Sequence, residues 1–424
     1  MVLTFALACS PHSVVLGSDD HSMGSNAGLD TAPEVAPGDS SADPEPAEHV
    51  LDAPAMATLA CGVPISADAE SACTFVLDWP DGAPNFDGDA TLQVRGRSSE
   101  GFPKQQYKLE LGSSDVAAPA DLLGLGRESD WVLNGMWIDR ALFRNKLAYD
   151  LFRELGGGTD WAPESAYVEL TLDGDYIGVY LLTETIDHDA SRLQFADDEG
   201  TGTQFIVAAD EAGFYSPVQY AGWEIEYPGA ESQTAAVVAG VRERVAMWEA
   251  LVMAGQDPFT QMNLDSFVRF VLVEEFVKNN DGYYLSHRIY THDDGSLHMV
   301  PWDLDLSLGQ PSYNDNENPE SWIAYRPDFV LNSALHAAFA ERLSEQWEAA
   351  RAGPLANQEV LAWQQGVRDL LGDAIDRNWT RWDIESVDFG GYLYRVSSPD
   401  EEYARVTTWT EQRLAWMDAE VERY

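Results

Sequence analysis

The sequence predicts an α+β protein of two lobes, a smaller β-rich lobe with one long helix followed by a larger, mostly helical lobe. Three observations lead to this fold class. Short runs that alternate apolar and polar residues, separated by turn residues, dominate residues 50–190. One run with helical spacing interrupts them at residues 139–156, and long amphipathic runs fill most of the last third. We therefore assign residues 49–190 to the β-rich lobe and residues 191–424 to the helical lobe.

The first lobe is predicted from its turns and alternation. Segments LQVRG (residues 92–96) and YKLEL (107–111) alternate as strands do, and RSSEGFP between them is a loop whose small residues permit close approach of the backbone. Further on, LDGD (172–175) predicts a tight turn between two β-rich arms. The one helix has Asp139 as its expected N-cap and Gly156 as its end.

The second lobe is predicted to be helical because its apolar residues recur at helical spacing. Residues 234–255 and 264–280 form two amphipathic runs, and Asn263 or Asp265 is available to cap the second. Three more runs, at residues 333–353, 357–379 and 399–424, extend the helical pattern to the end of the chain. We expect a single hairpin in this lobe, within residues 281–305.

The charge of the chain excludes one class of partner. The chain has 72 acidic and 25 basic residues, a formal net charge of −47, and only four lysines. Such a surface repels nucleic acid, which is itself a polyanion. We therefore expect no nucleic-acid partner.

The N-terminus favours export. Residues 1–9, MVLTFALAC, resemble the tail of a lipoprotein signal in which Cys9 would be lipidated and attach the protein to a membrane; an ordinary N-terminus is the alternative. Residues 10–48 are rich in Ser, Pro, Gly and acidic residues, which predicts a disordered tether. In an exported protein Cys61 and Cys73 would form a disulfide, whereas in the cytosol they would be two buried thiols.

Three carboxylates are gathered around the predicted hairpin. HDDG (residues 292–295) predicts its turn, so Asp281 before the first strand can approach Asp303 and Asp305 after the second. Carboxylates brought together repel one another unless a cation lies between them. Phosphoryl transfer requires such acids, one to orient the attacking hydroxyl and one to hold a metal ion, together with a lysine for the phosphates. Lys104 in the first lobe would supply that lysine.

The chain also resembles the CotH-type spore-coat atypical protein kinases. The resemblance covers roughly residues 50–380 and rests on five segments in the family's order, of which the fourth and fifth are the most specific: VRGRSSEGFPKQQYKLEL, LFRNKLAYDLFRELG, VELTLDGDYIGVYLLTETID, NNDGYY and PWDLDLSLG. It implies a two-lobed, kinase-like fold with the nucleotide between the lobes.

The resemblance also implies roles for individual residues. Asp281 takes the catalytic place, Asp303 the metal-binding place with Asp305 as the second acid, and Lys104 the phosphate-binding place. Glu184 falls where the lobes should hinge, within the nucleotide site. Ser286 stands where kinases have a metal-binding Asn, and a hydroxyl is the weaker Mg²⁺ ligand. Either Asp150 or Glu154 would be the helix acid that pairs with Lys104.

Several of these residues have structural alternatives. Lys108 on the next strand competes with Lys104 for the phosphate-binding place. Trp302 would line an adenine pocket or belong to the core. Three arginines would neutralise phosphates or form ion pairs with the many acids, namely Arg95, Arg97 and Arg144. Three histidines do not show metal-ligand spacing and are interpreted as surface or hairpin residues, namely His287, His292 and His298.

The resulting expectation is an exported atypical protein kinase of the cell envelope. It would transfer the γ-phosphoryl group of ATP, with Mg²⁺ or Mn²⁺, to Ser or Thr of an envelope or surface protein. One alternative is an exported binding module that has lost catalysis, which the scarcity of ATP outside the cytoplasm and Ser286 would favour. Another is an enzyme that uses the same site for a different nucleotide-dependent transfer, such as nucleotidylation or glutamylation.

Overall fold

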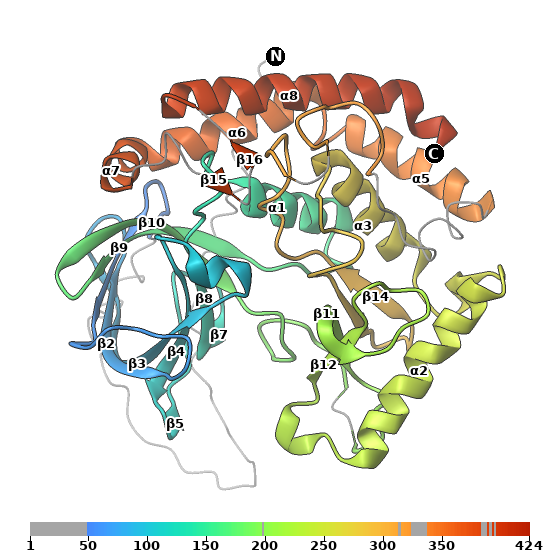
Figure 1. The fold of residues 1–424 in the computed structure, drawn as a ribbon, viewed down its shortest axis with the longest axis horizontal. Coiled ribbons are helices and arrows are strands. Elements are labelled where there is room, and N and C mark those ends of the chain that lie inside the picture. The colour runs from blue at the N-terminus through green and yellow to red at the C-terminus, as the bar shows by residue number, and fades with distance from the viewer. Residues whose placement is uncertain are drawn as a thin grey trace, which may run out of the picture.

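The protein has a mixed α+β fold in which a large sheet lies beside a helical part (Figure 1). This computed structural model describes residues 49–196, 199–312, 315–323, 337–382 and 396–424, together with 388–389 and 392–393. The predictions for the lipoprotein signal (1–9), Cys9 and the tether (10–48) lie outside the described residues. Within the described part of the chain, no helix is both long and apolar enough to span a membrane.

The large sheet closes on itself. Its order is β3-β2-β1-β9-β10-β8-β4-β5, and β3 also pairs with β4. β1 and β9 pair in parallel, whereas the other neighbours in the sheet are antiparallel. The strands are β1 (Ala55–Ala60), β2 (Ser71–Asp78), β3 (Pro84–Arg95), β4 (Gln106–Ser113), β5 (Val116–Ala117), β8 (Asp130–Asn134), β9 (Ser165–Leu172) and β10 (Asp175–Glu184). A two-stranded hairpin lies between β5 and β8, formed by β6 (Ala120–Asp121) and β7 (Arg127–Glu128).

The interior of this sheet is a hydrophobic cluster of its own. It includes Phe75, Leu92, Leu109 and Trp131, all fully buried. The predicted turn between β9 and β10 is present, with Asp173 at φ +49° and Gly174 at φ +86°, the left-handed conformation that such two-residue hairpins require.

The predicted disulfide between Cys61 and Cys73 is formed at one edge of this sheet. It joins Cys61, the first residue after β1, to Cys73 on β2. Asp173 lies beside it and accepts hydrogen bonds from the backbone N–H groups of Cys61, at 2.7 Å, and Gly62, at 2.9 Å. The bond and these two contacts tie the β1–β2 connection to the β9–β10 turn.

The second part of the chain consists of helices around a smaller sheet. In Figure 1 the long helix α8 runs across the top, with α6 and α5 beside it, α1 and α3 beneath, and the small sheet below them. The helices are α1 (Arg144–Gly156), α2 (Ala235–Met253), α3 (Leu264–Val277), α5 (Ala337–Arg351), α6 (Asn357–Leu371), α7 (Ala374–Arg381) and α8 (Pro399–Glu420). Short 3₁₀ turns are η1 (Ser98–Gly101), η2 (Ala230–Ser232), η3 (Pro258–Thr260) and η4 (Val421–Arg423).

The small sheet corrects one sequence prediction. Its order is β12-β11-β13-β14, so the hairpin at residues 281–305 does not stand alone in this part of the chain. The predicted turn at His292–Gly295 is confirmed, but two strands were missed. The strands are β11 (Ile206–Phe214), β12 (Trp223–Tyr227), β13 (Arg288–Thr291) and β14 (Leu297–Val300); a separate pair is β15 (Asp388–Phe389) and β16 (Tyr392–Leu393).

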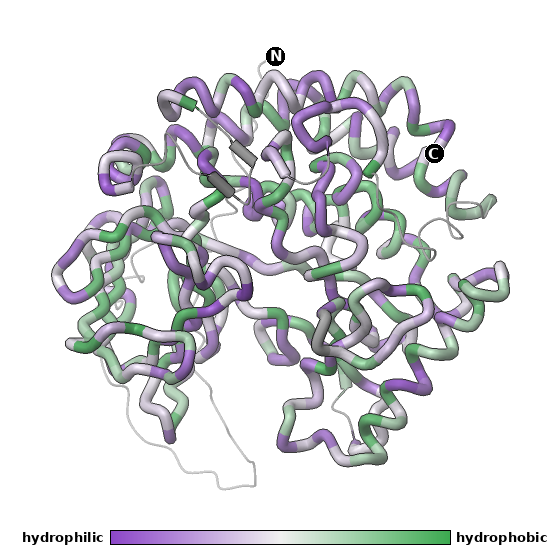
Figure 2. The backbone as a smooth tube through the Cα atoms, viewed as in Figure 1, coloured by the Kyte–Doolittle hydropathy of each residue, from purple (hydrophilic) through white to green (hydrophobic). Residues whose placement is uncertain are grey.

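Helix α3 is the central element of the second part. Every residue from Ser266 to Val277 is buried, and a helix that is apolar on all sides is one that packs against neighbours all round. The predicted cap Asn263 is confirmed, since its side chain accepts a hydrogen bond from the Ser266 N–H at 3.0 Å. Figure 2 shows α3 as largely hydrophobic, whereas hydrophilic and hydrophobic residues alternate along α8.

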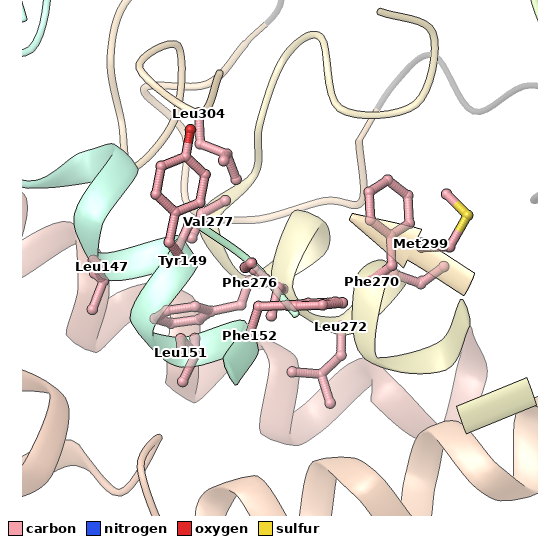
Figure 3. Packing of buried hydrophobic residues seen from close by; sticks show 14 of the residues in the cluster. Leu147, Tyr149, Leu151, Phe152, Phe270, Leu272, Phe276, Val277, Met299 and Leu304 are labelled. Atoms are coloured by element: carbon pink, nitrogen blue, oxygen red, sulfur yellow. The ribbon is translucent and has the colours of Figure 1, made fainter. Parts of the chain in front are cut away.

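Helix α1 packs against α3 rather than inside the large sheet. Leu147, Leu151 and Phe152 of α1 meet Phe270 and Phe276 of α3 in one core (Figure 3). The helix begins five residues later than Asp139, because Leu142 has a positive φ of +63° and cannot be helical. It ends at Gly156 as predicted, with Gly157 in the left-handed conformation.

Candidate active site

Most of the predicted site residues line one pocket. The pocket has a volume of about 480 Å³ and is lined by residues of β3, η1, β4 and β8 from the large sheet, and by residues of β11, β13 and the segments before β13 and after β14. Seven of the predicted residues line it, namely Arg95, Arg97, Asp281, Ser286, Trp302, Asp303 and Asp305. Residues more than 180 positions apart in the sequence therefore meet at this place.

The segment that carries Asp303 is held by α1. The backbone N–H of Asp303 donates a hydrogen bond to the hydroxyl of Tyr149 at 3.3 Å, and the N–H of Leu304 donates to Asn145 Oδ1 at 2.6 Å. Asp303 has a φ of +60°, a conformation that costs free energy for a residue with a side chain and persists where the surroundings enforce it. The fully buried Leu304 adds an anchor in the α1–α3 core (Figure 3).

A buried arginine holds the chain just beyond Asp305. Arg144 is fully buried, and its Nε donates to the carbonyl of Ser307 at 2.9 Å. Its guanidinium also pairs with Asp139 at 2.5 Å and with Glu402 at 2.9 Å. Of the two alternatives for Arg144, the structure therefore shows the ion pair, and its guanidinium is committed to support behind the pocket.

Asp281 lies in a turn that follows α3. The backbone carbonyl of Asp281 accepts hydrogen bonds from the N–H groups of Tyr284 and Leu285, both at 3.0 Å. The preceding residue, Asn280, donates its N–H to the carbonyl of Leu306 at 3.2 Å. This bond joins the turn to the segment after Asp305, so the three aspartates are brought together by backbone contacts.

The three carboxylates affect one another electrostatically. Burial raises the pKa of Asp281 to about 6, and the charge of Asp303 adds to this shift. Burial raises the pKa of Asp303 as well, although Arg95 and Arg288 act in the opposite direction. The pKa of Asp305 is raised well above its ordinary range by burial and by the charge of Asp303. Burial is therefore the main cause of all three shifts, and repulsion between carboxylates adds to it at Asp281 and Asp305.

The donor set fits a hard divalent cation. Asp303, Asp305 and Ser286 offer only oxygen atoms, the ligand type that Mg²⁺ and Mn²⁺ prefer. Ser286 has a φ of +67° and donates its N–H to the carbonyl of Ala209 on β11 at 2.9 Å. Its backbone is therefore held at the pocket wall beside the aspartates.

Arginines supply the positive charge in this pocket. Arg95 and Arg288 lie over the ring of Trp302, with 5.7 Å and 5.2 Å from guanidinium carbon to ring centroid. Arg288 also pairs with Glu226 at 2.7 Å. In addition, the ring of Tyr149 stacks on Trp302 at 5.9 Å. Trp302 thus lines the pocket as predicted, but its ring already contacts two cations and one aromatic side chain.

The loop between β3 and β4 covers another part of the pocket. Arg97 extends from it and pairs with Asp210 of β11 at 3.0 Å. Gly96 has a φ of +120°, and a Cβ there would lie 1.9 Å from Ser99 Oγ. A glycine is therefore required, and it lets the following turn, η1, bring Ser98 and Ser99 to the pocket wall.

Lys104 does not lie in this pocket, contrary to the place that the sequence indicated. It is 1% exposed, and its Nζ donates to the carbonyl of Val179 at 2.5 Å and to Asn378 Oδ1 at 2.8 Å. Burial lowers the pKa of Lys104 well below its ordinary range. The rival Lys108 is not a pocket residue either, since it pairs with Glu110 at 3.0 Å on the same strand.

The predicted acid partners of Lys104 also lie elsewhere. Asp150 pairs with Lys146 at 3.2 Å and, with Glu154, lines a different cavity.

Glu184, which was predicted to belong to the nucleotide site, is 2% exposed at the end of β10. There it accepts a hydrogen bond from the Glu164 N–H at 2.7 Å. Burial raises the pKa of Glu184 to about 8, and it does not line the pocket.

His292 and His298 are hairpin residues, as predicted, whereas the interpretation of His287 needs correction. His287 is not a surface residue but is 1% exposed, and its ring meets Trp223 edge-on at 5.6 Å. His298 is buried as well, and it lies with His292 and Asp294 in an arrangement that could hold a metal ion. Folding of the hairpin brings these three residues together, which their spacing in the sequence did not reveal.

Sequence reasoning missed two groups that position the aspartates, Asn145 and Tyr149. Both lie on α1, four positions apart and therefore on one face of the helix. Phe152, one turn further along the same face, is fully buried, as are Asn145 and Tyr149 themselves. Asn145 and Tyr149 are polar residues within an otherwise apolar helical pattern, and this pattern was the sequence signal that could have indicated their role.

Comparison with known proteins identifies the family. The profile of the family described as CotH kinase protein matches residues 92–417, about three quarters of the chain. This chain belongs to the CotH kinase family. Its 24% identity over 240 residues with the inner spore coat protein H of Bacillus subtilis (strain 168) agrees with that assignment. The alignment covers 54% of this chain and 61% of that relative, which is less than two thirds of its length. The family assignment therefore rests on the family profile over residues 92–417.

Proposed function

We propose that this CotH-family chain is a metal-dependent phosphotransferase that moves the γ-phosphoryl group of ATP to Ser or Thr of a protein. The observation that supports this proposal most is the composition of one pocket, in which three aspartates with raised pKa values meet arginines and a glycine loop. The large sheet and the helical part would then correspond to the two lobes of a kinase-like fold, with the nucleotide in the pocket between them.

Asp281 is the residue suited to act on the attacking hydroxyl. A pKa of about 6 leaves its carboxylate largely ionised at neutral pH, yet basic enough to accept a proton. In the transfer, the hydroxyl oxygen bonds to the γ-phosphorus, the bond to the β-phosphate oxygen breaks, and the hydroxyl proton passes to Asp281. ADP leaves as the second product.

Asp303, Asp305 and Ser286 would hold Mg²⁺ or Mn²⁺. When bound, the metal ion supplies neutralisation of the charge that develops on the phosphate oxygens. Arg95 and Arg97, which line the same pocket, would contact the phosphate oxygens. They would thus perform the phosphate-binding role that the sequence assigned to Lys104. In a chain of net charge −47, clustered arginines are what makes this pocket able to accept a polyanion.

A position at the cell envelope is part of the same proposal. The disulfide between Cys61 and Cys73 is of the kind that persists in oxidising compartments. The relative from Bacillus subtilis is named as an inner spore coat protein. Lipidation of Cys9 would attach this chain to a membrane, and intact mass of the protein recovered from its host would show the acyl groups.

The first test is thermal unfolding of the full chain with and without ATP plus Mg²⁺ or Mn²⁺. A ligand that binds the folded state raises the melting temperature. We expect a metal-dependent increase for the wild type, none for Asp303→Ala, and a normal increase for the control Asp175→Ala, which alters an exposed acid on β10. No increase with either metal would overturn the proposal and favour a binding module without catalysis.

The second test separates the kinds of transfer. After incubation of the protein with ATP, metal, free glutamate and candidate envelope proteins, intact-mass analysis distinguishes a phosphoryl from a nucleotidyl or glutamyl adduct. Asp281→Asn should bind ATP with the metal but lose about 10²–10⁴-fold in turnover, the usual contribution of a general base. A nucleotidyl or glutamyl product would support the nucleotide-binding pocket but refute phosphoryl transfer as its reaction.

A further inference from the structure

The turn end of the β13–β14 hairpin gathers two histidines and an aspartate. His292, Asp294 and His298 each place one potential ligand atom so that the three atoms lie within 4.8 Å of one another. The register explains this proximity: His298 is opposite Tyr290, and the N–H of His292 bonds to the carbonyl of Ser296 at 2.9 Å. The two imidazole rings therefore share one face of the hairpin, with ring centroids 4.4 Å apart.

His298 is oriented as metal-binding histidines are. Its side chain is 4% exposed, and its Nδ1 lies 2.7 Å from Asp160 Oδ1. Within the described residues, its Nε2 is buried and has no hydrogen-bond partner. Asp160 is a carboxylate and accepts a hydrogen bond from the Nδ1–H of His298, so in the neutral ring Nε2 carries the available lone pair. A carboxylate behind one ring nitrogen and a metal on the other is a recurrent arrangement.

Asp160 is itself held in place. Arg269 of α3 forms an ion pair with its other carboxylate oxygen. Asp160 lies in the connection between α1 and β9, so the contact joins that connection to both α3 and β14. The orientation of the His298 ring is therefore determined by three elements of the fold.

The other two groups leave access from outside. The side chain of His292 is 35% exposed and that of Asp294 is 55% exposed, with 3.4 Å between His292 Nδ1 and an Asp294 oxygen. His292 and Asp160 also line a cavity of about 800 Å³. An ion can enter from this side, and water can complete its coordination.

We propose that His292, Asp294 and His298 form a binding site for a divalent transition-metal ion of the Zn²⁺ class, with Asp160 as the hydrogen-bond partner that orients His298. Two imidazoles and a carboxylate are the ligand set of such ions, whereas Mg²⁺ prefers oxygen ligands alone. The site is at the turn end of the hairpin, while Asp303 follows the other end of β14. It is therefore separate from the pocket of the aspartates and does not depend on the proposed phosphotransferase activity.

The test is Zn²⁺ binding to the full, metal-stripped chain in the presence of excess Mg²⁺. Mg²⁺ occupies the many carboxylates of this acidic protein, so that imidazole-dependent binding remains visible. We expect one tightly bound Zn²⁺ per chain by equilibrium dialysis, and a Co²⁺-substituted protein with the visible absorption of imidazole-ligated cobalt. A wild-type protein that binds no Zn²⁺ under these conditions would overturn the proposal.

Variants identify the ligands. His292→Gln and His298→Gln should each abolish the cobalt spectrum, and Asp160→Asn should weaken Zn²⁺ binding by about 10–100-fold, as expected for a residue behind a ligand. His49→Gln is the matched control, since His49 also lies 3.0 Å from an aspartate but outside the cluster. Zn²⁺ binding that survives the double variant His292→Gln/His298→Gln would refute the site.

Two further controls keep the result interpretable. His12 and His21 of the N-terminal segment could bind Zn²⁺ on their own, so the variant His12→Gln/His21→Gln must retain the cobalt spectrum of the wild type. His292 is partly exposed, so His292→Gln should unfold at the temperature of the metal-free wild type even if His298→Gln does not fold. Loss of the spectrum only in the N-terminal variant would place the metal elsewhere.

Discussion

Two buried glutamates support the candidate active site from behind, and they differ in charge. Glu402 of α8 and Glu274 of α3 are both fully buried. Burial opposes the charge of Glu402, but Arg144 and Arg405 outweigh it, so the pKa of Glu402 lies below its ordinary range. Burial raises the pKa of Glu274 to about 8, and within the described part of the chain Glu274 forms no salt bridge. The first glutamate is a carboxylate at neutral pH and the second is largely protonated.

The difference shows that burial does not determine the state of an acid; its partners do. Around Glu402, an arginine fork compensates the loss of hydration, and the resulting network holds the chain after Asp305. Around Glu274, the neighbours are Asn279 and other acids, among them Asp281, and the proton itself provides the compensation. Asp281 and Asp305 belong with Glu274, because burial and neighbouring carboxylates together raise the pKa of each.

The largest expected effect comes from removing the arginine. Arg144→Met would leave Asp139 and Glu402 buried without their shared cation, and loss of one partner of such a pair costs about 3–5 kcal/mol of unfolding free energy. Denaturant unfolding measures it. The control Arg423→Met removes an exposed ion pair with Glu420 and should cost at most about 1 kcal/mol. Equal effects of the two substitutions would show that the Arg144 network does not stabilise the fold.

A second comparison replaces each glutamate by its neutral isostere at neutral pH. Glu402→Gln should lower the free energy of unfolding by about 1.5–3 kcal/mol, because it removes hydrogen bonds between charged groups. Glu274→Gln should change it little or raise it, because the native side chain is already largely neutral. Similar losses for the two variants would mean that Glu274 is ionised in the folded protein.

The pH dependence of stability gives a sharper distinction. The pKa of Glu274 is about 8 in the folded protein, against an ordinary 4.5. The folded state therefore keeps a proton that the unfolded state loses, and this contribution to stability declines as the pH rises from about 4.5 to about 8. Thermal unfolding of Glu274→Gln across that range should show a flatter profile than the wild type. An unchanged profile would exclude Glu274 as its source.

The smallest expected effect concerns the proposed reaction. The acid limb of kcat/KM should lie near pH 6, the pKa of Asp281, because kcat/KM reports the free enzyme and a base must be deprotonated. Activity should fall as the pH drops below this value. Glu274→Gln should leave the acid limb of kcat/KM near pH 6, since Glu274 is uncharged at that pH. An acid limb at higher pH in this variant would show that Glu274 affects the pKa of Asp281 by a contact other than its charge.

Much of the fold could be predicted because it follows from local patterns. Gly156 and Gly295 mark the end of α1 and the hairpin turn, and both predictions are confirmed. The strands β11 and β12 were missed because their residues do not alternate clearly and their pairing depends on β13, which lies some eighty positions further along the chain. Periodicity reports burial of one face, but it does not report which distant strand completes a sheet.

The candidate site could be predicted only in part. The NNDGYY and PWDLD segments indicated Asp281, Asp303 and Asp305, and one pocket contains all three. Lys104 was assigned from its place in the first lobe and from the family resemblance, yet it bonds to Asn378, which is 274 positions away. Such a contact leaves no trace in the local sequence, so Lys104 was placed in the pocket wrongly, whereas Arg95 and Arg97 line the pocket as the sequence suggested.

The sequence by itself determined the elements whose signals are local: the tight turns, the helix caps and ends, and the clustering of acids around one hairpin. Tertiary structure decided which charges meet. In the folded chain Arg95 and Arg288 lie over Trp302, and Lys104 is buried in the interior. His292 and His298 lie together on one face of the β13–β14 hairpin. The physical reason is that turns and helices depend on neighbours within a few residues, whereas the state of a buried charge depends on desolvation and on partners that only the folded chain brings into contact.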